Sequence, residues 1–208
     1  MLPTRSLLKL ERMWSIEAVQ GKPFQVLPRD SFTRHNIRGF DFDDSRVLVP
    51  QRVRGYFIDK NGSAKNGRFY DASNKYPAGG FTASAEQCLR FAITLGSGQV
   101  FSAKSLDQMW TAQTTALGKK SVFGLGWGVV ERNGQKMVGF NGLQPMTETA
   151  VRYFPASGAD VALFCNAEGA QGLSELMDVL TEILLGAKWE ESEPMKDSVP
   201  THAGKPAF

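Results

Sequence analysis

Residues 76–87 have the sequence Tyr-Pro-Ala-Gly-Gly-Phe-Thr-Ala-Ser-Ala-Glu-Gln, which predicts a tight glycine loop that runs directly into a capped helix. Ser84 followed by Gln87 is the pattern of a capping box, in which two side chains satisfy free backbone N–H groups at a helix start. The apolar residues that follow recur at the spacing of one helical face, which predicts packing against a core. They are Cys88, Phe91, Ala92 and Leu95. Gly96-Ser97-Gly98 is expected to end the helix.

The chain beyond this helix has the pattern of an antiparallel sheet. A short helix is predicted over 102–110, and residues 123–129 alternate as a half-buried strand that Asn133-Gly134 turns back. The other predicted strands are 137–140, 149–154 and 160–166. A final amphipathic helix, with its apolar stripe between Leu173 and Leu180, should cover the sheet. These patterns predict an α+β fold, with an antiparallel sheet and helices packed on it.

The N-terminal third of the chain has weaker signals. A first helix lined by Leu7, Leu10 and Trp14 is expected to end at Gly21, and residues 28–50 are expected to be loop-rich, with 41–44 as a turn. An extended pair is then predicted. It begins with Val53, Tyr56 and Ile58, is reversed by the Asn-Gly turns at 61–62 and 66–67, and returns through Phe69-Tyr70.

The glycine loop and its helix resemble the Pro-Ala-Gly-Gly segment of the serine β-lactamase-like family, which includes class C β-lactamases, DD-peptidases and related esterases. The Gly-Leu-Gly-Trp sequence at 124–127 and the strands at 153–155 and 161–166 resemble later parts of the same family, in the same order. The resemblance runs from about Gly21 to about Leu185 and implies an incomplete serine β-lactamase-like (DD-peptidase-like) fold. Residues 1–188 would be the C-terminal portion of that domain, and 189–208 a polar, disordered tail.

The catalytic groups that this resemblance implies are not found in place. Enzymes of the family need a Ser-x-x-Lys at the start of a buried helix, so that the amine can activate the hydroxyl, and a Tyr-x-Asn or Ser-x-Asn element. The one Ser-x-x-Lys here is Ser6 to Lys9, which only five residues precede, so a solvated helix start is favoured over a nucleophile and base. No Tyr-x-Asn occurs in the chain.

The third active-site motif of the family would lie at Phe140, Asn141 and Gly142. Phe140 would take the place of the motif's Lys or His and cannot donate a proton or attract a carboxylate. Asn141 would take the place of its Ser or Thr and is a candidate for hydrogen bonding an acyl substrate. With Gly79 and Gly80 these three residues form the predicted substrate-binding set. As aromatic residues at strand positions, Trp127 and Phe140 are expected to be core residues rather than ligand platforms.

Composition excludes several other classes of function. The chain has 24 basic and 21 acidic residues and a net charge of +3, which is too mild for a nucleic-acid partner. Cys88 and Cys165 are expected to be buried and unpaired. The lone histidines, His35 and His202, predict no metal site, and the cluster of acids at 41–44 fits a solvated turn better than a calcium loop. No cofactor and no membrane span are expected.

Two hypotheses of function remain open. The first is a serine hydrolase related to β-lactamases, acting on a small-molecule ester, amide or β-lactam, truncated and inactive as given because its nucleophile lies on a segment absent from this chain. The second is a non-catalytic remnant or binding module that retains the cleft wall. A sheet without the family's first strands leaves an edge uncovered, beside the final helix, through which the chain would self-associate. The protein would be cytoplasmic if Met1 is the true start, and exported if an upstream signal has been lost.

Overall fold

A four-stranded antiparallel sheet forms the centre of the fold, and its strands follow one another in the order β5-β6-β7-β8. The computed structural model describes residues 15–76 and 78–186. The strands are β5 (Gly128–Arg132), β6 (Gln135–Gln144), β7 (Thr147–Phe154) and β8 (Ala159–Cys165). Asn133 and Gly134 both have positive φ and join β5 to β6, as their sequence predicts. The predicted antiparallel meander is therefore confirmed.

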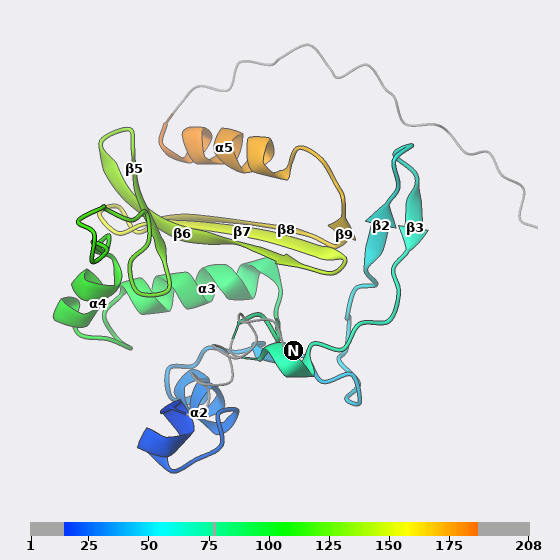
Figure 1. The fold of residues 1–208 in the computed structure, drawn as a ribbon, viewed down its shortest axis with the longest axis horizontal. Coiled ribbons are helices and arrows are strands. Elements are labelled where there is room, and N and C mark those ends of the chain that lie inside the picture. Colours follow the sequence, from blue (N-terminus) through cyan, green and yellow to red (C-terminus); the bar gives the residue numbers. More distant parts are fainter. Residues whose placement is uncertain (1–14, 77, 187–208) are drawn as a thin grey trace, which may run out of the picture.

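Two helices cover the two faces of this sheet. Helix α3 (Ala85–Gly96) lies under β7 and β8, and α5 (Leu173–Leu184) lies over the opposite face (Figure 1). The predicted capping box is present, because Ser84 Oγ accepts the N–H of Gln87 and the Gln87 side chain accepts the N–H of Ser84. The predictions of the last helix and its packing on the sheet are also correct.

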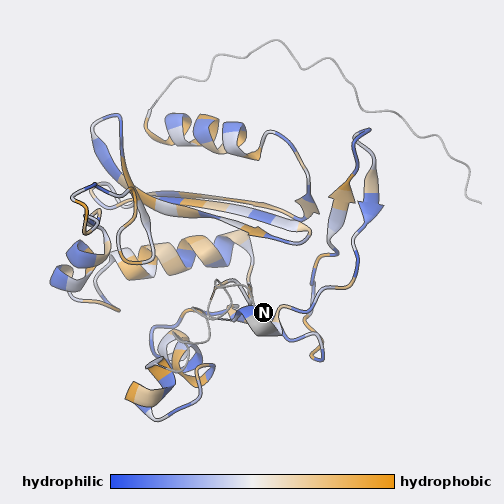
Figure 2. Ribbon diagram, viewed as in Figure 1, coloured by the Kyte–Doolittle hydropathy of each residue, from blue (hydrophilic) through white to orange (hydrophobic). Residues whose placement is uncertain are grey.

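The main core lies between the sheet and α3. Its buried members come from α3, from the short helix α4 (Ala103–Met109) and the residue after it, from the loop before β5 and from the sheet. Figure 2 shows hydrophobic residues along the sheet and α3. They are Leu95, Leu106, Trp110, Trp127, Val138 and Tyr153. On the opposite face, Phe154 of β7 and Met177 of α5 are completely buried. The sheet is thus packed on both sides, and its faces offer no open surface at these positions.

The N-terminal part contains more regular structure than the sequence analysis predicts. Residues 28–50 were expected to be loop-rich, but helix α2 (Val26–Arg34) covers the first of them. Pro28 fits there because it lies in the first helical turn, where backbone N–H groups have no partner within the helix. Residues 41–42 form strand β1 (Asp41–Phe42), which pairs with β4 (Phe81–Thr82), so they are not the predicted turn. Phe42 is buried there against Phe24, Tyr76 and Phe81.

A small three-stranded sheet lies beside the end of the main sheet. It consists of β2 (Tyr56–Ile58), β3 (Ala64–Asn66) and β9 (Ala167–Glu168), and β2 pairs antiparallel with β3 and parallel with β9. The turn at Asn61-Gly62 is confirmed. The second predicted turn is wrong, because Asn66 pairs with Tyr56 at the end of β3 instead of reversing the chain.

Residues 123–127 also differ from the predicted strand. Only Trp127 of their alternating large residues is buried, while Phe123 and Leu125 are 61% and 55% exposed. The segment is a loop that ends in β5, because the N–H of Leu125 bonds to the carbonyl of Met109 rather than to a neighbouring strand. Trp127 is a core residue as predicted, whereas Phe140 is 40% exposed.

Several predictions concern residues that the structure does not describe. Ser6, Lys9 and the predicted polar tail from 189 onward all lie outside the described residues. Within residues 15–76 and 78–186, no helix has the length and hydrophobicity needed to cross a membrane.

Candidate functional site

The second half of β6 has no strand partner on one side in the described sheet. Strand β5 pairs with β6 only as far as Gly139, whereas β7 pairs with it as far as Gln144. In the described sheet, residues 140–144 therefore have a strand on one side only, and we call the other side the β6 free edge. The three predicted third-motif residues, Phe140, Asn141 and Gly142, lie on this edge. An unpaired edge offers backbone N–H and C=O groups to an extended ligand.

Side chains along the β6 free edge alternate between the two faces of the sheet. Phe140 packs edge-to-face on Trp127, with ring centroids 5.7 Å apart, so Phe140 lies on the α3 face. Gly142 and Gln144 share this face by alternation. Asn141 lies opposite Ala150 and is exposed on the α5 face. The backbone of the edge is thus better placed than the Asn141 side chain to serve a ligand on the α3 face.

Gly142 is required by the neighbouring strand. A Cβ at this position would lie 2.5 Å from Thr149 Oγ1, directly across the β6–β7 ladder. Because glycine has no side chain, nothing from residue 142 projects from the α3 face, and a ligand can approach the backbone of the free edge there.

The glycine loop folds around one carbonyl group. Lys75 ends the short 3-10 helix η1 (Ser73–Lys75), and its carbonyl oxygen accepts the N–H groups of Ala78, Gly79 and Gly80 at 2.8, 3.0 and 3.1 Å. A Cβ on Gly80 would lie 2.8 Å from the backbone N and Cα atoms of Tyr76, so the turn has no space for a side chain. The two glycines predicted to belong to the site thus hold the loop closed.

The same loop contacts the end of the β6 free edge. A Cβ on Gly79 would lie 2.2 Å from Nε2 of Gln144, so the absence of a side chain allows this close approach. The structure therefore brings the Gly79 loop to β6, and the loop lies on the α3 side of the sheet (Figure 1). Loop and strand are separated by more than 60 residues in the sequence, and nothing in the local pattern predicts this contact.

A polar cluster that the sequence analysis does not predict lies at this junction. Lys75 Nζ donates to Gln144 Oε1 at 3.1 Å, and the Tyr70 hydroxyl donates to the same oxygen at 3.4 Å. Lys75 Nζ also lies 5.1 Å from the centroid of the Tyr70 ring, a cation–π arrangement. We call Tyr70, Lys75 and Gln144 the edge cluster. These three residues do not belong to a common sequence motif, and only the tertiary fold makes them neighbours.

The tip of the β6–β7 hairpin is anchored, which fixes the backbone position of Gln144. Met146 has a positive φ of 64°, is buried, and its N–H donates to Glu168 Oε2 at 3.2 Å. A Cβ at Gly67 would lie 1.9 Å from Met146 Sδ, and one at Gly55 would lie 2.6 Å from Met146 Cβ. These glycines form a cradle for the methionine, and the N–H of Gly67 donates to the carbonyl of Gly55, so Gly67 continues the pairing just beyond β3.

Two nucleophilic side chains that follow the loop, Ser84 and Cys88, are already engaged. Ser84 caps α3, as described above. Cys88 is buried, and burial raises the pKa of its thiol to about 11. Because the thiolate is the reactive form, Cys88 is an unreactive core residue at neutral pH. Neither Ser84 nor Cys88 therefore supplies an attacking atom beside the β6 free edge.

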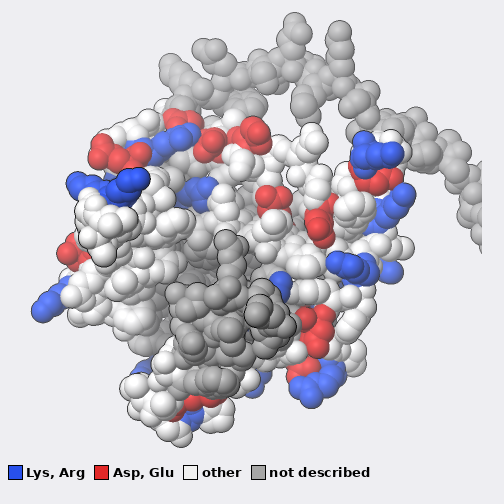
Figure 3. Space-filling view, viewed as in Figure 1, with Lys and Arg blue, Asp and Glu red and all other residues white. Residues whose placement is uncertain are grey.

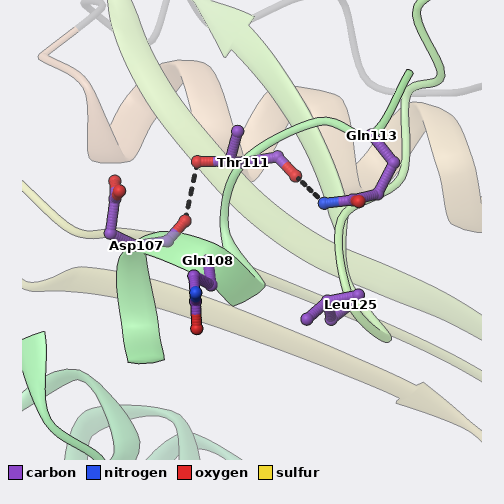
Figure 4. Close-up of a pocket in the computed structure, with 5 residues that line it drawn as sticks. All are labelled: Asp107, Gln108, Thr111, Gln113 and Leu125. Carbon is purple, nitrogen blue, oxygen red and sulfur yellow. Dashed lines mark hydrogen bonds between the residues drawn. The ribbon is translucent and has the colours of Figure 1, made fainter. Parts of the chain in front are cut away.

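Two hollows on the surface lie apart from the β6 free edge. The larger, of about 400 Å³, is lined by Asp107, Gln108, Thr111, Gln113 and Leu125 (Figure 4). Its Thr111 hydroxyl donates to the carbonyl of Asp107, and Gln113 Nε2 donates to the carbonyl of Thr111. These groups bond to the backbone of their own loop and do not form a nucleophile with a base. Hence this hollow does not have the chemistry of an acyl-transfer site.

The second hollow, of about 230 Å³, lies at the polar surface near η1. It is lined by Asp44, Ser45, Arg46, Asp71 and Ser73. Arg46 holds the pKa of Asp44 down, to about 2, through side-chain and backbone hydrogen bonds. Asp43 likewise pairs with Arg52. The acids at 41–44 thus neutralise arginines, and over the described parts of the face drawn in Figure 3 charges of both signs lie interspersed.

The chain belongs to the Beta-lactamase family, whose model matches residues 15–182. No curated protein matches it. Three solved structures share its fold. An octameric penicillin-binding protein homologue from Pyrococcus abyssi is 20% identical, with a TM-score of 0.69 over 82% of this chain and 40% of the other. A D-amino acid amidase from Ochrobactrum anthropi SV3, complexed with L-phenylalanine amide, is 20% identical, with a TM-score of 0.67 over 82% of this chain and 54% of the other.

A D-stereospecific amidohydrolase from a Streptomyces species is also similar, at 17% identity and a TM-score of 0.66 over 79% of this chain and 50% of the other. The chain thus spans about half or less of the length of these structures. The predicted resemblance to the serine β-lactamase-like family and the predicted α+β fold are both confirmed. At these identities the structural likeness concerns the fold, and the assignment to a family rests on the match over 15–182.

Proposed function

We propose that this chain provides the acyl-binding wall of a β-lactamase-related serine hydrolase and that the polypeptide of 208 residues does not form an acyl-serine by itself. The observation that carries the proposal is the β6 free edge, which is open from Phe140 to Gln144 and bordered by the Gly79 loop. An amide or ester group can lie along this edge and exchange hydrogen bonds with its backbone.

The alternatives for catalysis differ in where the nucleophile lies. If a segment outside this chain supplies the serine, lysine and tyrosine, the β6 free edge would position the acyl group for that serine. If no such segment exists, the chain is a non-catalytic binding module. Two structural neighbours, an amidase complexed with L-phenylalanine amide and an amidohydrolase, favour a small amide as the ligand to test. Both alternatives require that the edge bind such a compound.

Binding at the edge can be tested with N-acetylphenylalaninamide, a neutral compound with two amide groups. We expect its titration into the isotopically labelled chain to shift the backbone amide resonances of residues 140–144 and Gly79. Resonances of β5 should stay unchanged because that strand lies outside the open segment. An exposed edge forms only a few net hydrogen bonds, each contributing about 1 kcal/mol, so we expect an affinity no tighter than about millimolar.

The matched control for this titration is the edge of β8, which also pairs with one strand only. Shifts confined to β8, or spread evenly over both edges, would contradict a specific acyl-binding site at β6. The absence of any shift at 140–144 near the solubility limit of the compound would contradict the proposal itself.

We further propose that the chain self-associates through β8. This strand pairs only with β7 in the described sheet, lies next to α5, and has a buried carboxylate oxygen, Asp160 Oδ2, with no hydrogen-bond partner among the described residues. A structural neighbour is described as octameric, which favours the same idea. We expect sedimentation velocity to show a weight-average mass that rises with concentration. A sharp, reversible melt of a monomer that does not depend on concentration would contradict it.

A further inference from the structure

The β6 free edge has no cation where the family motif would place one, but it has one at its other end. We propose that Lys75 and Tyr70, which now donate to Gln144, bind the carboxylate of an acyl ligand that lies along this edge. The preferred ligand class is therefore an anionic acyl compound, such as an N-acylated amino acid or a short peptide with a free carboxyl group. This inference rests on the proposed function, because it names the substrate class of that same edge.

The charge of Lys75 is only partly compensated in the structure. Its amine contacts an amide oxygen of Gln144 and the face of the Tyr70 ring, both of which are neutral. Every other lysine of the described chain is exposed to solvent, and two of them also form ion pairs, Lys22 with Asp30 and Lys65 with Asp59. Among the described residues no carboxylate forms an ion pair with Lys75, although its side chain is half-buried. A half-buried cation with neutral partners gains when an anion arrives.

The carboxylate would find more than one donor. The Tyr70 hydroxyl now donates to Gln144 Oε1, and a carboxylate oxygen in place of that amide oxygen would accept from both Tyr70 and Lys75. Hydrogen bonds to an ionised acceptor are shorter and stronger than those to a neutral amide. Lys75 and Tyr70 should therefore bond more strongly to the ligand carboxylate than to Gln144, although the Gln144 side chain must move away.

Both sides of the edge cluster are held by the backbone before any ligand binds. The Lys75 carbonyl receives three N–H groups from the glycine loop, and the buried Met146, two residues beyond Gln144, anchors the hairpin tip. A site held in this way loses little conformational entropy on binding. From Phe140 to Gln144 the edge measures about 13 Å at roughly 3.3 Å per residue, which is enough for a dipeptide-sized ligand.

The geometry also gives the ligand an orientation. The exposed Phe140 ring, which packs on Trp127, lies at one end of the edge and on the same face as Gln144. The other end holds the cation. A compound with an aromatic or aliphatic group at one end and a carboxylate at the other matches both ends. A neutral compound of the same shape matches only the apolar end and the backbone.

The test compares N-acetylphenylalanine with N-acetylphenylalaninamide, which differ in charge and in little else. Both are titrated into the full chain, and binding is followed by the amide resonances of 140–144 and Gly79. We expect the carboxylate to bind about fivefold to tenfold more tightly, an effect of about one charge-assisted hydrogen bond. The preference should decline as salt is raised, because the cation is partly exposed.

Variants assign this preference to Lys75. Lys75→Gln should bind both compounds equally. Lys75→Arg should keep the preference, which would show that the position tolerates substitution. Lys136→Gln, on the same strand but in its paired half, is the matched control and should keep the full preference. Tyr70→Phe should lose part of it, since one donor is removed.

The outcomes separate this inference from the proposed function. If the amide shifts the edge resonances but the carboxylate binds no better, or if the preference survives in Lys75→Gln, the inference is overturned and the proposed function stands. If neither compound shifts the resonances of 140–144, both are overturned. A preference that Lys136→Gln removes as fully as Lys75→Gln would also overturn the inference, because it would reflect net charge alone.

Discussion

Phe154→Ala is expected to lower the free energy of unfolding by about 3–5 kcal/mol. Phe154 is the last residue of β7, is completely buried, and lies on the face covered by α5, where Met177 is also completely buried. Truncation to alanine would remove apolar contacts and leave a cavity in the layer that joins the sheet to α5. Urea unfolding followed by far-UV circular dichroism measures the change.

Phe123→Ala provides the control for this prediction. Phe123 is 61% exposed in the loop before β5, so its loss should change the free energy of unfolding by no more than about 0.5 kcal/mol. Similar losses for the two variants, or a loss of less than about 1 kcal/mol for Phe154→Ala, would show that α5 does not pack on the sheet as described.

The elements that the sequence predicts correctly are those fixed by local chemistry. The Ser84 and Gln87 cap fixes where α3 begins, and the Asn133-Gly134 pair fixes the hairpin between β5 and β6. Each needs only residues within a few positions of one another. Helix α5 likewise follows from periodicity within one segment, but of its predicted stripe only Met177 is buried, and Leu176 is 47% exposed.

The predictions that fail depend on contacts between distant segments. Asp41-Phe42 looks like part of an acidic turn, but the partner strand at 81–82 converts it to a strand and buries Phe42. Phe123 and Leu125 alternate like strand residues, yet Phe123 forms only an isolated bridge with Gly128 of β5, and the N–H of Leu125 bonds to the carbonyl of Met109. Tertiary pairing overrides local pattern in both cases.

The candidate site likewise has a part that the sequence predicts and a part that only the tertiary fold brings together. The resemblance to a family places Phe140, Asn141 and Gly142 on one strand, and the structure places that strand at an open edge. That Gly79 touches this edge, and that Lys75 and Tyr70 meet Gln144 there, requires the chain to fold over about seventy residues, a separation that no local pattern encodes. Asn141, which the motif favours, lies on the opposite face from this cluster.

The central claim is that the chain binds acyl groups without forming a covalent acyl-serine. The one Ser-x-x-Lys, Ser6 to Lys9, has no tyrosine partner in a Tyr-x-Asn sequence, and Phe140 replaces the expected cationic donor of the third motif. Such groups act as a unit, so the loss of one removes most of the rate. With two of them missing, we expect no covalent turnover with an activated acyl compound.

Intact-mass spectrometry after incubation with a fluorescent penicillin, and separately with a fluorophosphonate probe, tests this claim most directly. A matched sample of Ser6→Ala serves as the control. We expect the mass of the chain to stay unchanged with both probes, in the wild-type protein and in the variant. Stoichiometric labelling that disappears in Ser6→Ala would contradict it and make Ser6 and Lys9 the nucleophile and base, and stoichiometric labelling that persists in the variant would contradict it through another side chain.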